Sequence, residues 1–553
     1  MNKLPLFFQE KTGKISFQSE KKFNLFFWLN SLIFLIVIFF IILFLRLFQL
    51  TIVKGNYYQQ LARQNRLREL YIEAPRGKIL DRKGLTIAEN LPADIQQNKA
   101  RLTSKRVYKE PQAVAPLIGY QQIADSHEIK NDACLNKLTL GDQIGKKGVE
   151  KIYDCLLRGR PGVKAIEVDA KGNYLKTLTV VPPIPGQTLQ LALDLELQKK
   201  AYQLLEGKKG AIIAVKPTTG EILALVSTPS FDPLQVEKYL SDQDKPLFNR
   251  ATEGTYPPGS LFKLVVAAGA LEEKVIDEKT EFEDTGSIQA GPLTFGNWYF
   301  LQYGKTEGMV NIVKGIQRSN DIFFYKAGGR LGPEKIKIWA EKFGYGHTFN
   351  LGLDQSEGLI PSPFWKEEVL KEKWYLGDTY NLSIGQGYIL VTPLQVNMAT
   401  AAIANDGYLC DPQLIKVQSS KFKVQSCKKI PISNKTLRLI QEGMEKACSP
   451  GGTGWPLFNF KIQNAKFKVE KPPRFDKINE DRTSEVNIQT ACKTGTAESQ
   501  TKEAAPHAWF TVYAPFDKPE IALTVLVENG GQGSDVAGPI AKEILKAYFE
   551  RKE

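Results

Sequence analysis

A serine and a lysine three positions apart, Ser260 and Lys263, are the first candidates for covalent chemistry. If this segment is helical, both side chains lie on one face of the helix and can hydrogen-bond to each other. A buried, neutral lysine can then remove the proton from the serine hydroxyl and make the serine a nucleophile. The spacing alone does not select this pair, because it recurs at Ser19, Ser420, Ser426 and Ser499.

The sequence on either side of Ser260 distinguishes it from the other serines. The stretch Tyr-Pro-Pro-Gly at 256–259 precedes it, and the apolar run LFKLVVAAGAL follows it, which predicts a helix that begins at this serine. The backbone N–H of a residue at a helix start lies at the positive end of the helix dipole, where it can stabilise an oxyanion. The alternative interpretation is an ordinary helix cap.

Two further motifs carry groups that suit the same chemistry. Ser319-Asn320-Asp321 lies between two helical patterns and offers a hydroxyl that can relay a proton, although such a triplet is more often a turn. Lys493-Thr494-Gly495-Thr496 suits a strand whose glycine lets an extended peptide approach, and its lysine would attract a substrate carboxylate. A second Lys-Thr-Gly at 11–13 shows that this motif alone is not specific.

The elements that must position these residues predict an α+β fold. After about residue 189 the chain has the pattern of a compact mixed domain, whereas 46–188 reads as a β-rich stalk of short apolar runs and turns. The charged, proline-containing stretch 461–488 predicts a surface insertion. The clearest elements of the mixed domain are strands at 211–215, 221–227, 509–514 and 521–527 and a final helix at 538–549.

An uncharged run of 23 residues at 23–45 is long enough to cross a bilayer as a helix. A cleaved signal peptide or a buried helix is the alternative, but no small-residue cleavage site follows the run. Lysines in 1–22 favour a cytoplasmic N-terminus, which places the remaining chain outside the cytoplasm.

Composition and charge exclude several classes of protein. The net charge of +13 comes from scattered Lys and Arg without a zinc-finger or RNA-binding pattern, so we expect no nucleic acid partner. The six cysteines include no CxxC pair and predict no disulfide framework, with at most one bridge, Cys410 to Cys427. None of the three histidines, His127, His347 and His507, accompanies a nucleophile elbow, which argues against a Ser-His-Asp triad.

The order SxxK, SxD, KTG resembles that of the penicillin-binding protein and serine β-lactamase superfamily. Further segments of the chain carry a closer resemblance, at 75–84, 145–150, 227–233, 377–387, 391–395 and 507–515. By these segments the chain is identified as a member of the class B penicillin-binding proteins. The resemblance implies a transpeptidase domain at 189–553, an antiparallel sheet flanked by helices, on a pedestal at 46–188 with a shortened head. Asp321, where Asn is commoner, and the GDT at 377–379 resemble elongation-type members.

The family resemblance implies a D,D-transpeptidase that cross-links peptidoglycan and is acylated by β-lactams. Ser260 would attack the penultimate D-Ala carbonyl of a stem peptide, and an amine on a neighbouring strand would take the acyl group. By resemblance, Lys263 is the base, and Ser319, Asp321 and Lys493 manage proton transfer. The same resemblance assigns the oxyanion hole to the backbone N–H groups of Ser260 and Thr496, and substrate contacts to Asn320, Thr494, Gly495 and Thr496.

The resemblance also implies which other molecules to expect. The partners would be stem peptides ending in D-Ala-D-Ala and a separate glycosyltransferase of the SEDS family, since no room for a polymerase domain exists before residue 190. We expect no cofactor. The stretch 264–318 holds no His or Cys, so the zinc ligands that some elongation-type relatives carry there cannot be present, and we predict no structural metal.

Four alternatives stay open at this point. The chain could be a septal transpeptidase, a D,D-carboxypeptidase or β-lactamase, a β-lactam sensor, or a non-catalytic scaffold. A stalk and a single anchor argue against a secreted hydrolase, and 22 residues are short for a sensor's output domain. Turnover separates the four: an amine acceptor yields cross-linked product, a hydrolase releases acid, a sensor stays acylated and a scaffold is not acylated.

Overall fold

The computed structural model describes residues 25–91, 94, 101–169, 171–416, 427–463, 485–499 and 504–550. The chain divides into two compact units, which we describe separately. The first consists of Met1–Leu70 with Val163–Val181, and the second of Tyr71–Gly162 with Pro182–Glu553.

The first unit contains the apolar N-terminal helix and a β-hairpin. Helix α1 (Leu25–Phe48) continues through a π-helical turn, Gln49–Val53. The candidate membrane span Phe26–Val53 contains an 18-residue stretch with a mean hydropathy of 3.0 and no buried residues. The predicted span 23–45 is thus confirmed as an apolar helix of sufficient length, although its first two residues lie outside the described residues. The other elements are α2 (Gly55–Arg66), β1 (Leu67–Ile72), β8 (Gly162–Val168) and β9 (Tyr174–Val181), of which β8 and β9 pair antiparallel.

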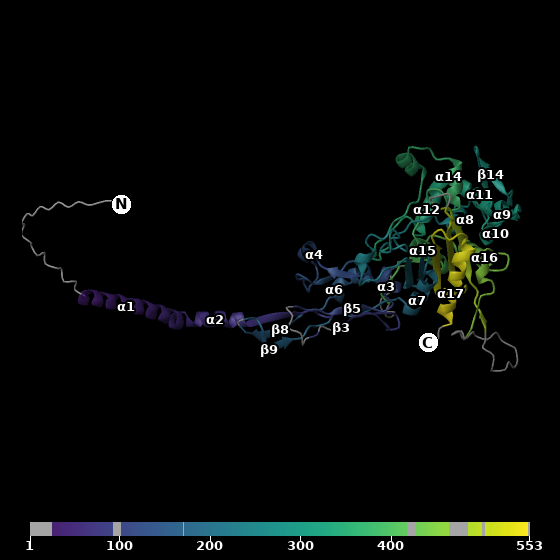
Figure 1. The fold of residues 1–553 in the computed structure, drawn as a ribbon. Coiled ribbons are helices and arrows are strands. Elements are labelled where there is room, and N and C mark those ends of the chain that lie inside the picture. Colours follow the sequence, from purple (N-terminus) through teal and green to yellow (C-terminus); the bar gives the residue numbers. More distant parts are fainter. Residues whose placement is uncertain are drawn as a thin grey trace, which may run out of the picture. The chain divides into compact units, whose positions relative to one another are not determined.

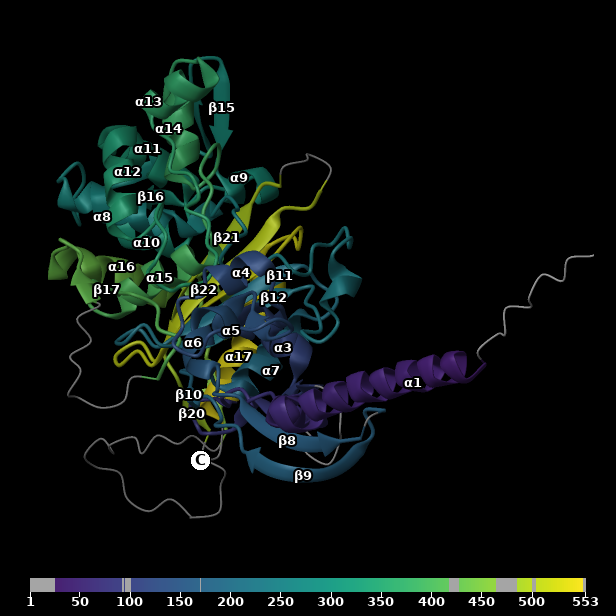
Figure 2. The ribbon, with the colours of Figure 1, turned by 90° about the vertical axis from the view of Figure 1, so that its left-hand side faces the viewer.

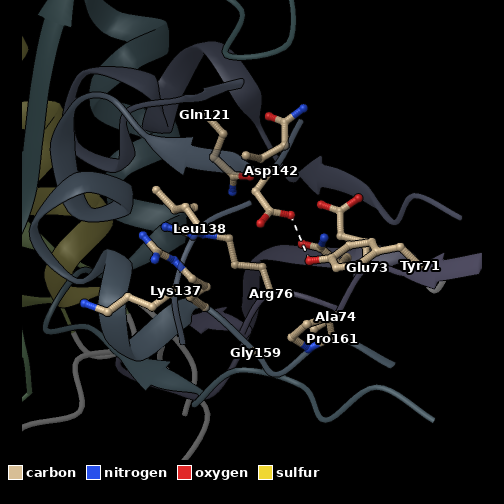
Figure 3. Close-up of a pocket in the computed structure, with 13 residues that line it drawn as sticks. Tyr71, Glu73, Ala74, Arg76, Gln121, Lys137, Leu138, Asp142, Gly159 and Pro161 are labelled. Atoms are coloured by element: carbon tan, nitrogen blue, oxygen red, sulfur yellow. Dashed lines mark hydrogen bonds between the residues drawn. The ribbon is translucent and has the colours of Figure 1, made fainter. Parts of the chain in front are cut away.

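The N-terminal part of the second unit is built around buried ion pairs. Glu150 is fully buried and pairs with Arg76 at 2.6 Å and with Arg106 at 2.7 Å. Figure 3 shows the polar hollow beside this cluster, where the Tyr71 hydroxyl donates to Asp142 at 2.9 Å. A small sheet has the order β10-β2-β3-β5. The elements are β2 (Ile79–Leu80), β3 (Thr86–Leu91), β4 (Arg101–Leu102), β5 (Lys105–Tyr108), β6 (Gln121–Ile123), β7 (Gln143–Gly145), β10 (Leu189–Gln190), α3 (Pro111–Ile118), α4 (Ser126–Lys130), α5 (Gly148–Ile152) and α6 (Asp154–Leu157).

A five-stranded antiparallel sheet with the order β12-β11-β23-β22-β21 forms the centre of the second unit. Figure 1 gives the overall view of the chain, and Figure 2 labels β11, β12, β21 and β22 of this sheet. Nearly every residue of these strands is buried, because helices cover both faces, so the strands read as apolar runs instead of alternating patterns. The predicted α+β fold with helices on an antiparallel sheet is confirmed. The strands are β11 (Gly210–Val215), β12 (Ile222–Thr228), β21 (Ala491–Ala497), β22 (His507–Ala514) and β23 (Ile521–Val527).

Two hydrophobic cores lie on opposite faces of this sheet. Ile212 and Ala214 of β11 face one core with α7 (Leu195–Leu205) and α17 (Gly538–Phe549), whereas Ala211 and Ile213 face the other core with the remaining helices. Those helices are α8 (Lys263–Glu272), α10 (Ile312–Gln317), α11 (Asp321–Leu331), α12 (Pro333–Lys342), α14 (Leu376–Ser383), α15 (Pro393–Ala404) and α16 (Asn434–Ala447). The shorter elements are α9 (Trp298–Tyr303), α13 (Pro363–Trp365), β13 (Phe282–Asp284), β14 (Ser287–Ala290), β15 (Leu293–Gly296), β16 (Gly308–Val310), β17 (Tyr408–Cys410), β18 (Cys427–Lys429), β19 (Lys461–Ile462) and β20 (Val486–Asn487).

The cysteines form three disulfides, so the expectation of at most one bridge is wrong. The expected bridge Cys410–Cys427 is present, because these residues lie opposite each other in the β17–β18 pair. The other two are Cys134–Cys155 and Cys448–Cys492. Cys448 follows α16 and Cys492 belongs to β21, so the tertiary fold brings these two together and their spacing in the sequence does not reveal it.

The predicted insertion 461–488 lies mostly outside the described residues, at 464–484. Its two ends are described, and β19 and β20 pair antiparallel there. The surface character of the stretch between them stays a prediction.

Candidate active site

Ser260 lies in a tight turn that leads into α8. The turn Gly259–Leu261 is a 3-10 helix, and α8 begins at Lys263, so the predicted helix begins three residues after the serine. Gly259 adopts a left-handed φ of 54°, and a Cβ at this position would lie 2.7 Å from the Thr496 carbonyl oxygen. Only glycine fits this turn without strain, and the turn holds Ser260 against the end of β21.

The Lys263 ammonium group points toward the second motif and not toward Ser260. Its Nζ donates to the Asp321 carboxylate at 2.6 Å, to the Ser319 carbonyl at 2.7 Å and to Ser319 Oγ at 3.2 Å. The expected hydrogen bond between Ser260 and Lys263 is absent from the described residues, because the carboxylate is the stronger acceptor for an ammonium group. Burial lowers the pKa of Lys263, and the adjacent Asp321 opposes this shift.

Lys493 reaches the same hydroxyl from the opposite side. Its Nζ donates to Ser319 Oγ at 2.8 Å, and its side chain is fully buried in β21. Burial, together with the positive charge of Lys263, holds the pKa of Lys493 well below its usual range, and Asp321 opposes the shift only in part. Two buried lysines therefore share the hydroxyl of Ser319. The backbone of Ser319 is left-handed, with a φ of 53°.

Strand β21 is an edge strand of the central sheet, so its free side can pair with an extended peptide. Gly495 lies between Leu261 and Trp509, where a Cβ would meet atoms of both side chains at 3.0 Å. The Thr494 hydroxyl donates to the Thr453 hydroxyl at 2.8 Å, and the Thr496 side chain is exposed. The structure thus brings the predicted residues of all three motifs together at one end of this strand.

Asn320 is the member of the second motif whose side chain is directed into the protein. It is 1% exposed, its Oδ1 accepts from the Phe323 N–H at the start of α11, and its Nδ2 donates to the Asp284 carboxylate at 2.8 Å. Its predicted contact with substrate stays a prediction.

Four residues beside the motifs were not predicted from the sequence. Asn297 accepts from the Asp321 N–H at 3.1 Å, and Asp284 accepts from Asn320, so both touch the second motif. Thr453 touches Thr494, and the Gln386 amide donates to the Thr496 carbonyl at 3.3 Å. A signal for Gln386 lies in the segment 377–387, which carried part of the family resemblance, whereas the other three positions follow no recognisable spacing.

No cluster of three His, Cys, Asp or Glu side chains suited to a metal ion occurs in the part of the chain that the structure describes. The groups that converge at Ser319, beside the turn that carries Ser260, are hydroxyls, ammonium groups and one carboxylate. They suit proton transfer and acyl transfer.

Comparison with known families and proteins agrees with this geometry. The chain matches the penicillin binding protein transpeptidase domain over residues 210–546 and the penicillin-binding protein dimerisation domain over 93–191. It is 35% identical to peptidoglycan D,D-transpeptidase MrdA of Acinetobacter baumannii, over 80% of this chain and 66% of that protein. The corresponding values for MrdA of Escherichia coli K12 are 31%, 80% and 70%, so the chain spans about two thirds of the length of these curated relatives.

Solved structures show the same fold. Pseudomonas aeruginosa PBP2, crystallised with the compound WCK 5153, is 30% identical with a TM-score of 0.70, over 87% of this chain and 96% of that one. PBP2 of Helicobacter pylori, solved in complex with MreC, is 28% identical with a TM-score of 0.69, over 87% and 98%. This chain belongs to the class B penicillin-binding proteins, the family of peptidoglycan transpeptidases. The MrdA relatives favour an elongation-type member over the septal alternative.

Proposed function

We propose that this chain cross-links peptidoglycan stem peptides during cell-wall elongation, with Ser260 as the nucleophile and β-lactams as covalent inhibitors. The observation that carries the proposal is the convergence of Lys263 and Lys493 on the Ser319 hydroxyl beside the Ser260 turn. Burial lowers the pKa of both lysines, which favours a neutral amine that can accept a proton.

In the proposed acylation, Ser260 Oγ forms a bond to the carbonyl carbon of the penultimate D-Ala. The serine proton passes to Lys263 and, through Ser319 Oγ, to Lys493, while Asp321 stabilises the ammonium form of Lys263. The backbone N–H groups of Ser260 and Thr496 hold the oxyanion. The C–N bond then breaks, and the terminal D-Ala leaves as an amine that takes the proton back.

The substrate contacts belong to β21 and its surroundings. The donor peptide pairs with the free edge of β21 alongside Gly495, and the hydroxyls of Thr494 and Thr496 bind the terminal carboxylate. Asn320 contributes to the same wall of the site. A primary amine of a second stem peptide attacks the acyl carbon, the C–O bond to Ser260 breaks, and the proton that the amine loses passes through Lys263 to Ser260 Oγ, which completes the cross-link.

The proposed organisation follows the sequence-based division. Residues 1–22 form a cytoplasmic tail, 23–45 span the membrane, 46–188 form the pedestal and 189–553 the extracytoplasmic transpeptidase domain. We propose a SEDS-family glycosyltransferase as the partner, supported by a 27% identical solved structure described as coordinating polymerization and crosslinking in a peptidoglycan synthase complex. The H. pylori complex with MreC supports an MreC-like protein as a second partner.

The test is covalent labelling of the full-length protein in detergent with fluorescent penicillin. We expect stable label on the peptide that contains Ser260, no label in Ser260→Ala, and unchanged label in Ser420→Ala, which removes another serine of the same Ser-x-x-Lys spacing. Donor stem peptide with an amine acceptor should then yield cross-linked dimers. Hydrolysis without dimers would favour a carboxypeptidase, label without either product a sensor, and absence of label on folded wild type a scaffold.

A further inference from the structure

Asp284 is a buried carboxylate held entirely by hydrogen bonds. It is 3% exposed, and its Oδ2 accepts from Asn297 Nδ2 at 2.8 Å, from Asn320 Nδ2 at 2.8 Å and from the Glu307 N–H at 3.0 Å. Its Oδ1 accepts from the Gly286 N–H at 3.0 Å. No Lys or Arg of the described residues forms an ion pair with it. A buried charge that depends on four donors fixes those donors strongly, since moving any of them leaves the charge less satisfied.

Asn297 extends this arrangement to the second motif. It is fully buried at the start of α9, its Nδ2 donates to Asp284, and its Oδ1 accepts from the Asp321 N–H at 3.1 Å. The next residue, Trp298, donates its backbone N–H to Asp321 Oδ2 at 2.9 Å. The carboxylate of Asp321 is thus held at one oxygen by the backbone after Asn297, and its other oxygen, Oδ1, is left for Lys263 at 2.6 Å.

We propose that Asp284 and Asn297 are positioning residues for acylation, which hold Asn320 and Asp321 so that Lys263 and Ser319 stay aligned with Ser260. Neither residue touches the reacting atoms, and both act through the second motif. This inference rests on the proposed function, because it assigns a role in the same acyl transfer. It explains why the segment 282–310, which carries none of the three motifs, packs against Ser319-Asn320-Asp321.

The test measures the two steps of penicillin acylation separately, by stopped-flow labelling of full-length protein in detergent. We expect Asp284→Asn and Asn297→Ala to slow the covalent step about 10- to 100-fold, as misalignment of catalytic groups by about 1 Å does, with an unchanged Kd for the non-covalent complex. Asp277→Asn, an exposed aspartate in the preceding loop, is the matched control and should label like wild type.

Two further readouts separate positioning from a merely structural role. Asp321 opposes the fall in the pKa of Lys263, so a misplaced Asp321 should lower this pKa further and move the pH profile of the covalent step to lower pH. The exchange variant Asp284→Asn/Asn297→Asp restores a donor and acceptor between the two positions, and it should recover part of the rate.

Failure of this inference differs from failure of the proposed function. Unlabelled wild type would overturn the proposed function itself. Labelled wild type, together with Asp284→Asn and Asn297→Ala variants that acylate at the wild-type rate, would overturn only the positioning role. The positioning role would also be overturned if Kd rose by the same factor as the rate of the covalent step fell, the pH profile did not shift and the exchange variant recovered no rate. That combination would indicate a general loss of structure.

Discussion

Removal of the Cys448–Cys492 disulfide should lower both the stability of the protein and the rate of its acylation. The bridge joins two residues 44 positions apart in the sequence. The resulting loss of chain entropy raises the free energy of the unfolded state by about 4 kcal/mol at 25 °C. An unfolding entropy of about 2.1 cal/mol/K per residue over the residues 210–546 then predicts a Tm about 6 °C lower for Cys448→Ala/Cys492→Ala.

The same change should affect acylation, because this bridge joins β21, which carries Lys493, to the loop that supports it. Cys492 immediately precedes Lys493, and the loop after Cys448 brings Thr453 to the Thr494 hydroxyl at 2.8 Å. The control, Cys410→Ala/Cys427→Ala, removes a bridge of separation 17, for which the same reasoning gives about 3 kcal/mol and a fall of about 4 °C.

Differential scanning fluorimetry and penicillin labelling of the full-length protein measure the two effects. The wild type should keep its bridges through purification, as counted by thiol alkylation and mass spectrometry. Equal acylation rates in the two double variants and in wild type would refute a role of the Cys448–Cys492 bridge in holding β21. An unchanged Tm in the Cys448→Ala/Cys492→Ala variant would refute the entropy argument.

Two further predictions concern buried charges. Lys493→Met should abolish labelling and raise the free energy of unfolding near pH 7. The pKa of Lys493 is lower in the folded state than in the unfolded state, so below about pH 10.5 folding must either remove the proton of this lysine or bury its charge, and both cost stability. The gain of the variant over wild type should therefore shrink as denaturation is measured at rising pH. Glu150→Gln should cost about 3 to 5 kcal/mol in chemical denaturation, because it leaves Arg76 and Arg106 short of a buried anion, while acylation of the folded protein keeps its rate. Glu89→Gln, which removes an exposed pair with Lys78, is the control and should leave the free energy of unfolding close to that of wild type.

The sequence predicted the parts of the fold and site that depend on local pattern. The strands at 211–215, 509–514 and 521–527 and the helix at 538–549 were predicted because their apolar runs and turn signals lie within a few residues of each other. The three motifs were predicted by their order along the chain. The structure confirms that they meet, since Lys263 and Lys493 both reach Ser319.

What the sequence could not predict depends on contacts between distant segments. Asp284 and Asn297 carry no motif, and their importance comes from hydrogen bonds across 36 and 24 positions of the chain to Asn320 and Asp321. The partner of Cys492 is likewise set by how α16 packs on β21, and not by spacing. The predicted hydrogen bond between Ser260 and Lys263 is absent from the described part of the chain, because Asp321 is a stronger acceptor for the Lys263 ammonium group. The sequence pattern did not show that Asp321 would lie within reach of this group.

The two lysines differ in the groups that surround them, and these groups shift the two pKa values to different extents. Lys263 has a carboxylate at 2.6 Å, whereas Lys493 has a hydroxyl and a carbonyl as acceptors and the ammonium of Lys263 as a neighbour. Asp321 therefore favours the proton on Lys263, and burial beside that charge favours the neutral form of Lys493. In the proposed acylation, Lys493 therefore accepts the proton that Lys263 gives up through Ser319 Oγ, which is bonded to both nitrogens, and Lys263 then takes the proton of Ser260. The proposed mechanism therefore requires Lys493, which is remote from Ser260 in the sequence, as well as the adjacent Lys263.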